Sequence, residues 1–301
     1  MHTSVTFLYY FPTEVSFVTV TLGLSLGQTM SEQPDETDDE PIVAELRPVY
    51  HSLFNFLDLS DAVTASSDDT QELGLTREGF TYGETDIGSV WSILRSVELA
   101  SYTCRCAKTK PGGKPPSRSN ERCSRCGMRR EGATIVDLGS GIGNVVAAIA
   151  LLSSSGALGD GRVTAVHGVE LLPRLHAAGE RAMLSLSKWA ESAGRTLPHC
   201  ELTCAHLESY DLSDVDLVYM ASTVFENSVL ERFKVNAAAN LRRHARVVTL
   251  HSALSHPAFR VERVVKCMNS WGEEEAFVNV LVDGATQTEE ALAHAPAPGP
   301  Q

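Results

Sequence analysis

Three glycines at alternate positions form the first stretch of this chain that could do chemistry. Gly139, Gly141 and Gly143 follow the apolar run 133–138 in the spacing G-x-G-x-G. A strand, a tight glycine turn and a helix make up the first half of a nucleotide-binding unit. The dinucleotide fingerprint G-x-G-x-x-G does not fit, because Asn144 stands where its third glycine would be, and the sequence lacks the Gly-Lys-Ser/Thr of a P-loop.

Two acidic residues flank the glycine loop and indicate its ligand. Asp137 precedes the turn, where a carboxylate would repel a phosphate and attract a cation. Glu170 ends the next apolar run, 27 residues beyond Gly143, with Gly168 just before it; an acid there can accept hydrogen bonds from a ribose diol. S-adenosyl-L-methionine carries a sulfonium, an ammonium and a carboxylate but no phosphate, so we predict that it is the cofactor. The alternative is a generic strand–turn–helix with a surface glutamate.

A cysteine cluster could hold a metal. Cys104, Cys106, Cys123 and Cys126 form C-x-C followed by C-x2-C, and residues 105–130 between and around them carry nine Lys and Arg against one acid. Four thiolates suit a structural zinc ion, which would order a segment that has little core of its own. The alternative is four exposed thiols on a solvated loop. The basic residues predict a local contact with nucleic acid.

Alternating strands and helices must position these residues. Apolar runs and helical periodicity from residue 133 onward predict a mostly parallel, doubly wound α/β sheet. The expected strands are 133–138, 163–169, 201–205, 217–220, 247–251, 260–268 and 275–282, and the expected helices are 144–152, 171–193 and 226–241.

The part before residue 133 predicts two helical segments separated by a polar loop. Residues 41–59 have helical spacing, with a break expected near Pro48. Residues 60–73 are polar and predict a loop. An amphipathic helix is expected over 87–97, with Thr85 or Asp86 as its N-cap.

Composition bounds the remaining segments. The net charge of −13 disfavours DNA as a partner for the whole molecule, and 43% hydrophobic residues suffice for a sizeable core. We expect an apolar then acidic, disordered N-terminus over 1–40, a cap and cofactor lid over 41–103, a basic Cys-rich insertion over 104–130, a methyltransferase core over 131–283 and a disordered tail over 284–301.

The apolar N-terminal stretch fits no targeting pattern. Pro12 and Glu14 interrupt it and no basic residues precede it, so it predicts neither a membrane span nor a signal peptide. A start at Met30 is the alternative, which mass spectrometry of the native N-terminus would test. No membrane partner is expected.

Several motifs together resemble one family. TYGET (81–85), VDLGSGIGNVV (136–146) and HGVE (167–170) stand in the order and spacing of the Dot-type (disruptor of telomeric silencing, non-SET) histone H3 lysine methyltransferases. The stretches 221–233, 241–254 and 268–282 fit as well, so the resemblance covers about residues 50–282. Many methyltransferases share the glycine loop, whereas TYGET is the specific signal.

The resemblance implies a seven-stranded, mostly parallel, Rossmann-like class I methyltransferase sheet with a helical N-terminal cap. It also implies that the loop 82–85 closes over the cofactor, with Glu84 receiving the methionine ammonium, and that Glu170 accepts the ribose. The cofactor-binding residues expected in this way are Tyr82, Gly83, Glu84, Thr85, Asp137, Gly139, Ser140, Gly141, Gly143, Asn144, Glu170, His206 and Leu207.

The chain departs from the family at two positions. At the end of the third strand the family has Gly-Asp followed by a bulky residue next to the adenine, whereas this chain has Ala205, His206 and Leu207 in those places, and Glu208 is a substitute acceptor. Ala221 stands where the family has an Asn near the methyl group. The expected acceptor-side residues are therefore the hydroxyls of Ser222 and Thr223 and the aromatic rings of Phe225 and Trp271; for the rings, ordinary packing is the alternative.

Three functions remain open from the sequence. The first is a nuclear methyltransferase acting on histone H3 in nucleosomes, which TYGET and the basic segment favour. The second is a methyltransferase acting on a non-histone protein or a small molecule. The third is a pseudo-enzyme that binds the cofactor without turnover, and the changes at Ala221 and His206 favour the last two.

Overall fold

The computed structural model describes residues 3–11, 14–22, 40–56, 59–75, 85–97, 132–159, 163–222, 225–242, 245–270 and 272–282. Contacts divide the chain into two units, Met1–Asp38 and Asp39–Gln301. Within the described ranges, no helix is long and apolar enough to span a membrane.

The first unit contains a two-stranded hairpin. Strand β1 (Thr3–Phe11) pairs antiparallel with β2 (Glu14–Leu22), and Phe11 lies opposite Glu14. We expected residues 1–40 to lack regular structure, and the hairpin differs from that expectation. Both strands are rich in β-branched and aromatic residues, which favour extended structure.

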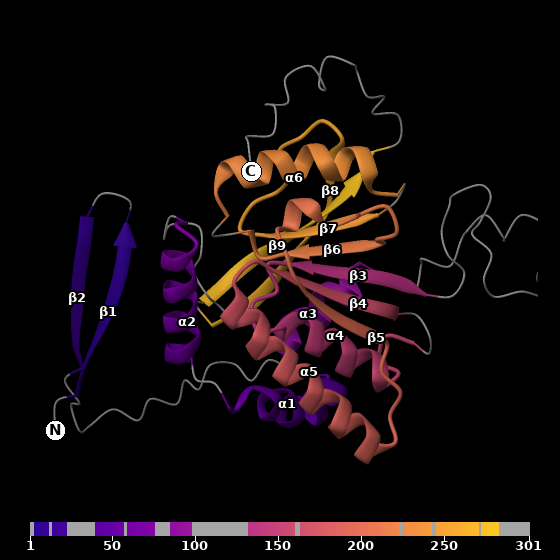
Figure 1. Cartoon of the computed structure of the whole chain (residues 1–301), viewed down its shortest axis with the longest axis horizontal. Coiled ribbons are helices and arrows are strands. Elements are labelled where there is room, and N and C mark those ends of the chain that lie inside the picture. The colour runs from indigo at the N-terminus through magenta and orange to yellow at the C-terminus, as the bar shows by residue number, and fades with distance from the viewer. Residues whose placement is uncertain are drawn as a thin grey trace, which may run out of the picture. The chain divides into compact units, whose positions relative to one another are not determined.

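The second unit is built around a seven-stranded sheet in the order β5-β4-β3-β6-β7-β9-β8 (Figure 1). The five strands from β5 to β7 run parallel, and β9 runs antiparallel to both β7 and β8. This order confirms the predicted class I, Rossmann-like fold. The bounds are β3 Ala133–Leu138, β4 Val163–Glu170, β5 His199–Cys204, β6 Leu217–Met220, β7 Arg246–Leu250, β8 Phe259–Asn269 and β9 Gly272–Leu281.

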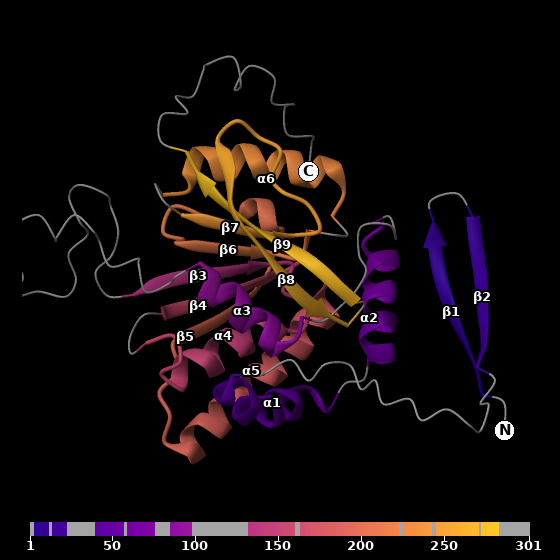
Figure 2. The ribbon, with the colours of Figure 1, turned by 180° about the vertical axis from the view of Figure 1, so that it is seen from behind.

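Helices cover both faces of this sheet (Figure 2). One face packs against α4 (Asn144–Ser154), α5 (Pro173–Ala193) and the cap helices, and the other packs against α6 (Asn227–Asn240) and the short 3-10 helix η4 (Leu207–Ser209). Strand β3 is buried along its whole length, as expected of a central parallel strand covered on both faces. All elements predicted from residue 133 onward form, and their ends differ by no more than three residues.

The cap consists of α1 (Pro41–Phe54), α2 (Leu59–Glu72) and α3 (Ile87–Ser96). The predicted break near Pro48 is wrong, since α1 continues through it. The side chains of Val43, Leu46 and Tyr50 are buried in the core, and such packing can outweigh the hydrogen bond that a proline removes. In α3, Asp86 is the N-cap, as one of the two expected residues, and accepts a hydrogen bond from the Gly88 N–H at 2.7 Å.

The predicted loop over 60–73 is also wrong, because this segment is the helix α2. Its buried side chains include Ala62, Ser66, Asp69 and Thr70. They lie at helical spacing, but they are small or polar, so hydrophobic periodicity could not reveal them.

Candidate active site

The candidate site lies at the carboxyl edge of the parallel strands, where the strand order reverses. From β3 the chain builds β4 and β5 on one side, and it then returns to add β6 on the other. Open α/β sheets bind ligands at such a switch point. The glycine loop follows β3 at this edge, and Glu170 is the last residue of the neighbouring β4.

The glycine loop has the backbone that its sequence requires. Gly139, Gly141 and Gly143 have φ angles of +81°, +54° and +83°, a region that side chains disfavour. The N–H groups of Gly139 and Ser140 both donate to the Val169 carbonyl, at 2.8 and 3.0 Å. The loop is therefore held against the end of β4.

Close neighbours surround two glycines of the site. A Cβ atom on Gly139 would lie 2.6 Å from Cζ of Phe225, so the Phe225 ring lies against the loop. A Cβ atom on Gly168 would lie 2.5 Å from a Leu202 methyl and 2.8 Å from Ser140 Oγ. Gly168 therefore allows the loop to pack on β4.

The Glu170 side chain, at the end of β4, contacts the glycine loop that follows β3. It is 7% exposed, and its carboxylate accepts hydrogen bonds from the N–H of Gly141 at 2.7 Å and of Leu172 at 2.8 Å. Burial raises the pKa of Glu170, although the hydrogen bonds from Leu172 and Gly141 oppose that shift. The expected ribose acceptor thus also holds the middle of the glycine loop.

Asp137 is a buried acid on β3, 2% exposed. Burial raises its pKa well above the usual range, and the charge of Glu170 adds to this shift. Asp137 lies in register with Tyr219 on β6. A buried carboxylate is costly without a cationic or hydrogen-bonding partner, so a ligand that carries an ammonium or a sulfonium would compensate for this burial.

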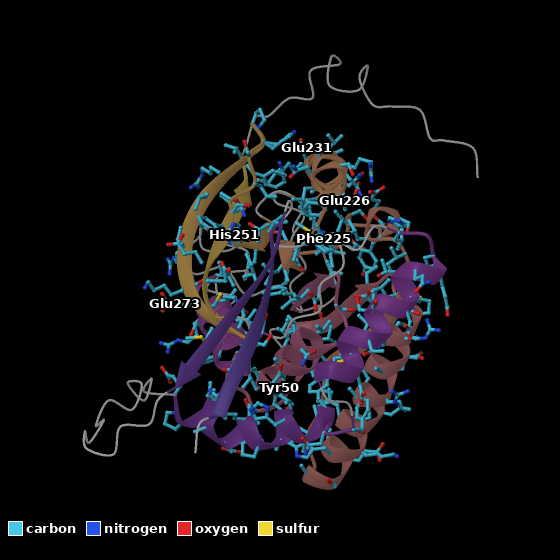
Figure 3. The ribbon with its side chains drawn as sticks, turned by 90° about the vertical axis from the view of Figure 1, so that its left-hand side faces the viewer. Tyr50, Phe225, Glu226, Glu231, His251 and Glu273 are labelled. Carbon is cyan, nitrogen blue, oxygen red and sulfur yellow. The ribbon has the colours of Figure 1, made fainter. Side chains whose placement is uncertain are left out.

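Thr85, the last residue of the TYGET motif, is attached to the same region. Its hydroxyl lies 3.0 Å from the Tyr219 hydroxyl, and its carbonyl accepts a hydrogen bond from Tyr50 at 2.9 Å. Tyr50 lies on α1 (Figure 3). Thr85 also bridges to Asn269 at the end of β8. The residues Tyr82, Gly83 and Glu84 lie outside the described ranges.

The structure describes only some of the residues expected on the methyl-acceptor side. Ser222 Oγ donates a hydrogen bond to the Leu250 carbonyl at 2.9 Å. The proton of this hydroxyl is therefore already used in a contact with the last residue of β7. Phe225 belongs to the chain segment that joins β6 to α6 and is labelled in Figure 3. Thr223 and Trp271 fall outside the described residues, and Ala221 is half-buried.

The residues expected on the adenine side follow β5 in the chain, in the segment that leads to β6. His206 is exposed, while Leu207 packs into the core on the α6 face together with Phe225. Glu208, the proposed substitute acceptor, pairs with Arg232 at 2.7 Å. Its carboxylate is therefore directed towards α6.

The described residues fit S-adenosyl-L-methionine. Ser140 Oγ is buried within the glycine loop and has no hydrogen-bond partner among the described residues, which leaves it available to a ligand. Glu170 would provide an acceptor for ribose hydroxyls, and Asp137 would provide a negative charge for a cationic ligand. Asn144 starts α4 and is buried next to the loop.

Sequence reasoning missed four residues at this site. Tyr50 and Tyr219 hold Thr85, and Asp69 contacts Arg174 beside Glu170. A tyrosine in a strand or a helix ordinarily indicates core packing, and Asp69 lies in the segment that we expected to be a loop. No hydrophobic pattern in the sequence marked these residues.

The zinc prediction lies outside the described residues, because Cys104, Cys106, Cys123 and Cys126 and the basic segment 105–130 belong to the range 98–131. Among the residues that the structure describes, no group of acids, histidines and cysteines could hold a metal ion. Of the remaining cysteines, Cys267 is buried, Cys200 is half-buried and Cys204 is exposed.

No family model and no curated protein matches the chain. Several solved structures are similar to it in part. An RNA methyltransferase from Salinibacter ruber in complex with S-adenosyl-L-homocysteine aligns over 52% of this chain and 84% of its own, with a TM-score of 0.38 and 19% identity. TrmN from Thermus thermophilus aligns over 50% of this chain, with a TM-score of 0.38 and 16% identity, and the match spans 44% of that protein.

A TehB-like SAM-dependent methyltransferase from Corynebacterium glutamicum aligns over 75% of this chain and 100% of its own, with a TM-score of 0.36 and 13% identity. At these TM-scores and identities the similarity assigns neither a fold nor an activity. The class I sheet order, by contrast, follows from the strand pairing of this chain itself.

Proposed function

We propose that this protein is an S-adenosyl-L-methionine-dependent methyltransferase. One observation carries the proposal: two buried carboxylates lie at the carboxyl ends of adjacent parallel strands, Asp137 as the last but one residue of β3, just before the G-x-G-x-G loop, and Glu170 as the last residue of β4. Glu170 also accepts a hydrogen bond from the N–H of Gly141 at the centre of that loop. When bound, the cofactor would supply an activated methyl group on a sulfonium.

The chain's own residues would bind and orient that cofactor. Glu170 would accept hydrogen bonds from the ribose diol, and Ser140 Oγ would gain the partner that it lacks among the described residues. Asp137 would face the positively charged methionine portion. Methyl transfer is a displacement in which a nitrogen–carbon bond forms as a sulfur–carbon bond breaks, so alignment of donor and acceptor provides most of the catalysis.

For the acceptor, we propose a lysine side chain of histone H3 in the nucleosome. The motif TYGET supports this assignment, together with the position of Thr85 beside Tyr219. Transfer requires a neutral amine, and apolar surroundings lower the pKa of an ammonium group. Phe225 would provide such surroundings next to the glycine loop. A nuclear location and a nucleic-acid contact through residues 105–130 belong to this proposal.

A second candidate has a specific observation in its favour. Ala221 replaces the family's Asn, and the hydroxyl of Ser222 is bonded to the Leu250 carbonyl. Neither side chain supplies a free polar group to the acceptor. A different methyl acceptor, or a protein that binds the cofactor without turnover, would be consistent with this arrangement.

Two measurements test the proposal. Calorimetry with S-adenosyl-L-homocysteine should give binding that is lost in Gly141→Val, while the exposed Gly194→Val retains it. Incubation with tritiated cofactor should label H3 in recombinant nucleosomes. Labelling of another band in cell extract would identify a different acceptor, binding without any label would indicate a pseudo-enzyme, and lack of binding by the wild type would overturn the proposal.

A further inference from the structure

Helix α2 contributes a buried acid to the turn that follows Glu170. Asp69 is 2% exposed, and its Oδ2 accepts a hydrogen bond from the backbone N–H of Arg174 at 2.7 Å. Its other oxygen pairs with the Arg174 guanidinium, which also contacts both carboxylate oxygens of Glu72, at 2.6 and 3.1 Å. Two acids of α2 therefore hold the first turn of α5.

The first turn of α5 needs this contact because it has no cap of its own. Its N-cap residue is Leu172, which makes no side-chain capping bond, and Pro173 has no N–H. The first N–H groups of a helix require external acceptors. Glu170 accepts that of Leu172, and Asp69 accepts that of Arg174.

Glu170 and Asp69 thus bind the same turn, one from within β4 and one from α2. The two carboxylates also interact electrostatically. Burial is the main cause of the raised pKa of Glu170, and the negative charge of Asp69 raises this pKa further. The guanidinium of Arg174 lies between α2 and α5 and offsets the negative charge of Asp69. Movement of α2 would therefore disturb the segment that fixes the Glu170 carboxylate.

We propose that Asp69 and Arg174 are positioning residues, which hold Glu170 in place for the ribose hydroxyls of the cofactor. The inference rests on the proposed function, since it requires a nucleoside ligand at Glu170. It links α2, which lies outside the sheet, to nucleoside binding. By reciprocity of linked equilibria, the bound nucleoside would stabilise the docking of α2.

The test compares Asp69→Ala with Asp69→Asn by calorimetry using S-adenosyl-L-homocysteine. Asp69→Ala should weaken binding about tenfold, a typical effect of losing one charge-assisted hydrogen bond. Asp69→Asn keeps an acceptor for the Arg174 N–H and should recover most of the affinity. The matched control is Glu45→Gln, which removes the exposed ion pair with Arg195 just beyond the other end of α5.

A second ligand separates positioning from general loss of structure. With the 2′,3′-dideoxyribose analogue of S-adenosyl-L-homocysteine, wild type and Asp69→Ala should bind within about twofold of each other, because the hydroxyls that Glu170 would accept are gone. Equal weakening for both ligands, or no weakening for either, would overturn the inference. If Asp69→Ala does not fold, Arg174→Lys replaces it: this variant keeps the backbone N–H bond to Asp69 but loses the guanidinium contacts, so it should weaken S-adenosyl-L-homocysteine binding by a smaller factor and leave binding of the dideoxy analogue unchanged.

The controls distinguish this inference from the proposed function. If wild-type protein binds S-adenosyl-L-homocysteine and the variants behave like wild type, only the role of Asp69 and Arg174 is wrong. If folded wild-type protein binds neither ligand, the proposed function is wrong, and the positioning role is overturned with it.

Discussion

The two halves of the candidate site are built differently. On the cofactor side, Glu170 accepts hydrogen bonds from the N–H groups of Gly141 and Leu172. Asp137 and Ser140 are buried at the glycine loop. On the acceptor side, the hydroxyl of Ser222 bonds the Leu250 carbonyl, and Ala221 has no polar side-chain group. The fold therefore arranges more polar groups on the proposed cofactor side than on the proposed acceptor side.

The largest expected effect breaks the cofactor side at Gly139. Gly139→Ala would place a Cβ atom 2.6 Å from the Phe225 ring on a residue with φ of +81°. We expect cofactor affinity to fall about 100-fold or more, equivalent to about 2.7 kcal/mol. Calorimetry with S-adenosyl-L-homocysteine measures this loss.

Gly194 provides a matched control for that prediction. It has φ of +62°, and a Cβ atom added there would have no neighbour within 4 Å, so Gly194→Ala carries the backbone strain without the clash. The double variant Gly139→Ala/Phe225→Leu should recover part of the affinity. Near-normal binding by Gly139→Ala alone would contradict the close packing of Phe225 on the loop.

The next effect concerns Asp137, whose buried carboxyl has a raised pKa, mainly through burial and then through Glu170. Between the ordinary pKa of 3.8 and the raised value, the folded state binds more protons than the unfolded state, so the unfolding free energy falls as pH rises. Asp137→Asn should flatten this dependence and stabilise the ligand-free protein at pH 7–8, by about 1 kcal/mol or more.

Urea unfolding between pH 4 and pH 8 measures that dependence, and Asp68→Asn at an exposed position is the control. The same Asp137→Asn variant should lose affinity for S-adenosyl-L-methionine, because the negative charge is removed. A stability gain without any loss of affinity would separate Asp137 from the cofactor.

A smaller effect tests whether Thr85 belongs to the cofactor side. Tyr219→Phe removes the hydroxyl that lies 3.0 Å from Thr85 Oγ1 and should lower the unfolding free energy by about 1 kcal/mol. If Thr85 fixes the end of a cofactor-binding segment, the KM for the cofactor should rise a few-fold while kcat stays the same. Unchanged kinetics with lowered stability would make the contact purely structural; Tyr50→Phe, which frees the Thr85 carbonyl, serves as comparison.

The smallest effect is expected on the acceptor side. Because Ser222 Oγ donates to the Leu250 carbonyl, Ser222→Ala should lower stability by about 1 kcal/mol and change kcat by less than about threefold. Steady-state kinetics and thermal unfolding of the same preparation measure both. A drop in kcat without any loss of stability would instead place the Ser222 hydroxyl in the reaction.

Local patterns predicted the core of the fold well. The run 133–138 is buried on both faces and could only be a central strand, and the glycines after it have the positive φ angles that their spacing indicated. Patterns failed for α2, whose buried face includes Ser66 and Asp69, and at Pro48, where packing of α1 outweighs the local cost of proline.

The residues of the candidate site also fall into those that sequence patterns could assign and those that they could not. Asp137, Ser140 and Glu170 could be assigned because they lie within a few residues of a strand end, where parallel topology brings them together. Tyr50, Thr85 and Tyr219 come from α1, the start of α3 and β6, and no spacing in the sequence relates them. Ser222 was expected to offer its hydroxyl, but only the folded chain shows the Leu250 carbonyl beside it.

The sequence by itself determined the succession of strands and helices from residue 133 onward, the glycine loop and the two acids beside it, because these depend on residues close together in the chain. The tertiary structure alone decided the partners of those residues: Phe225 on Gly139, Tyr219 on Thr85, and Asp69 on the turn after Glu170. Such contacts depend on the packing of distant segments, which local periodicity does not encode.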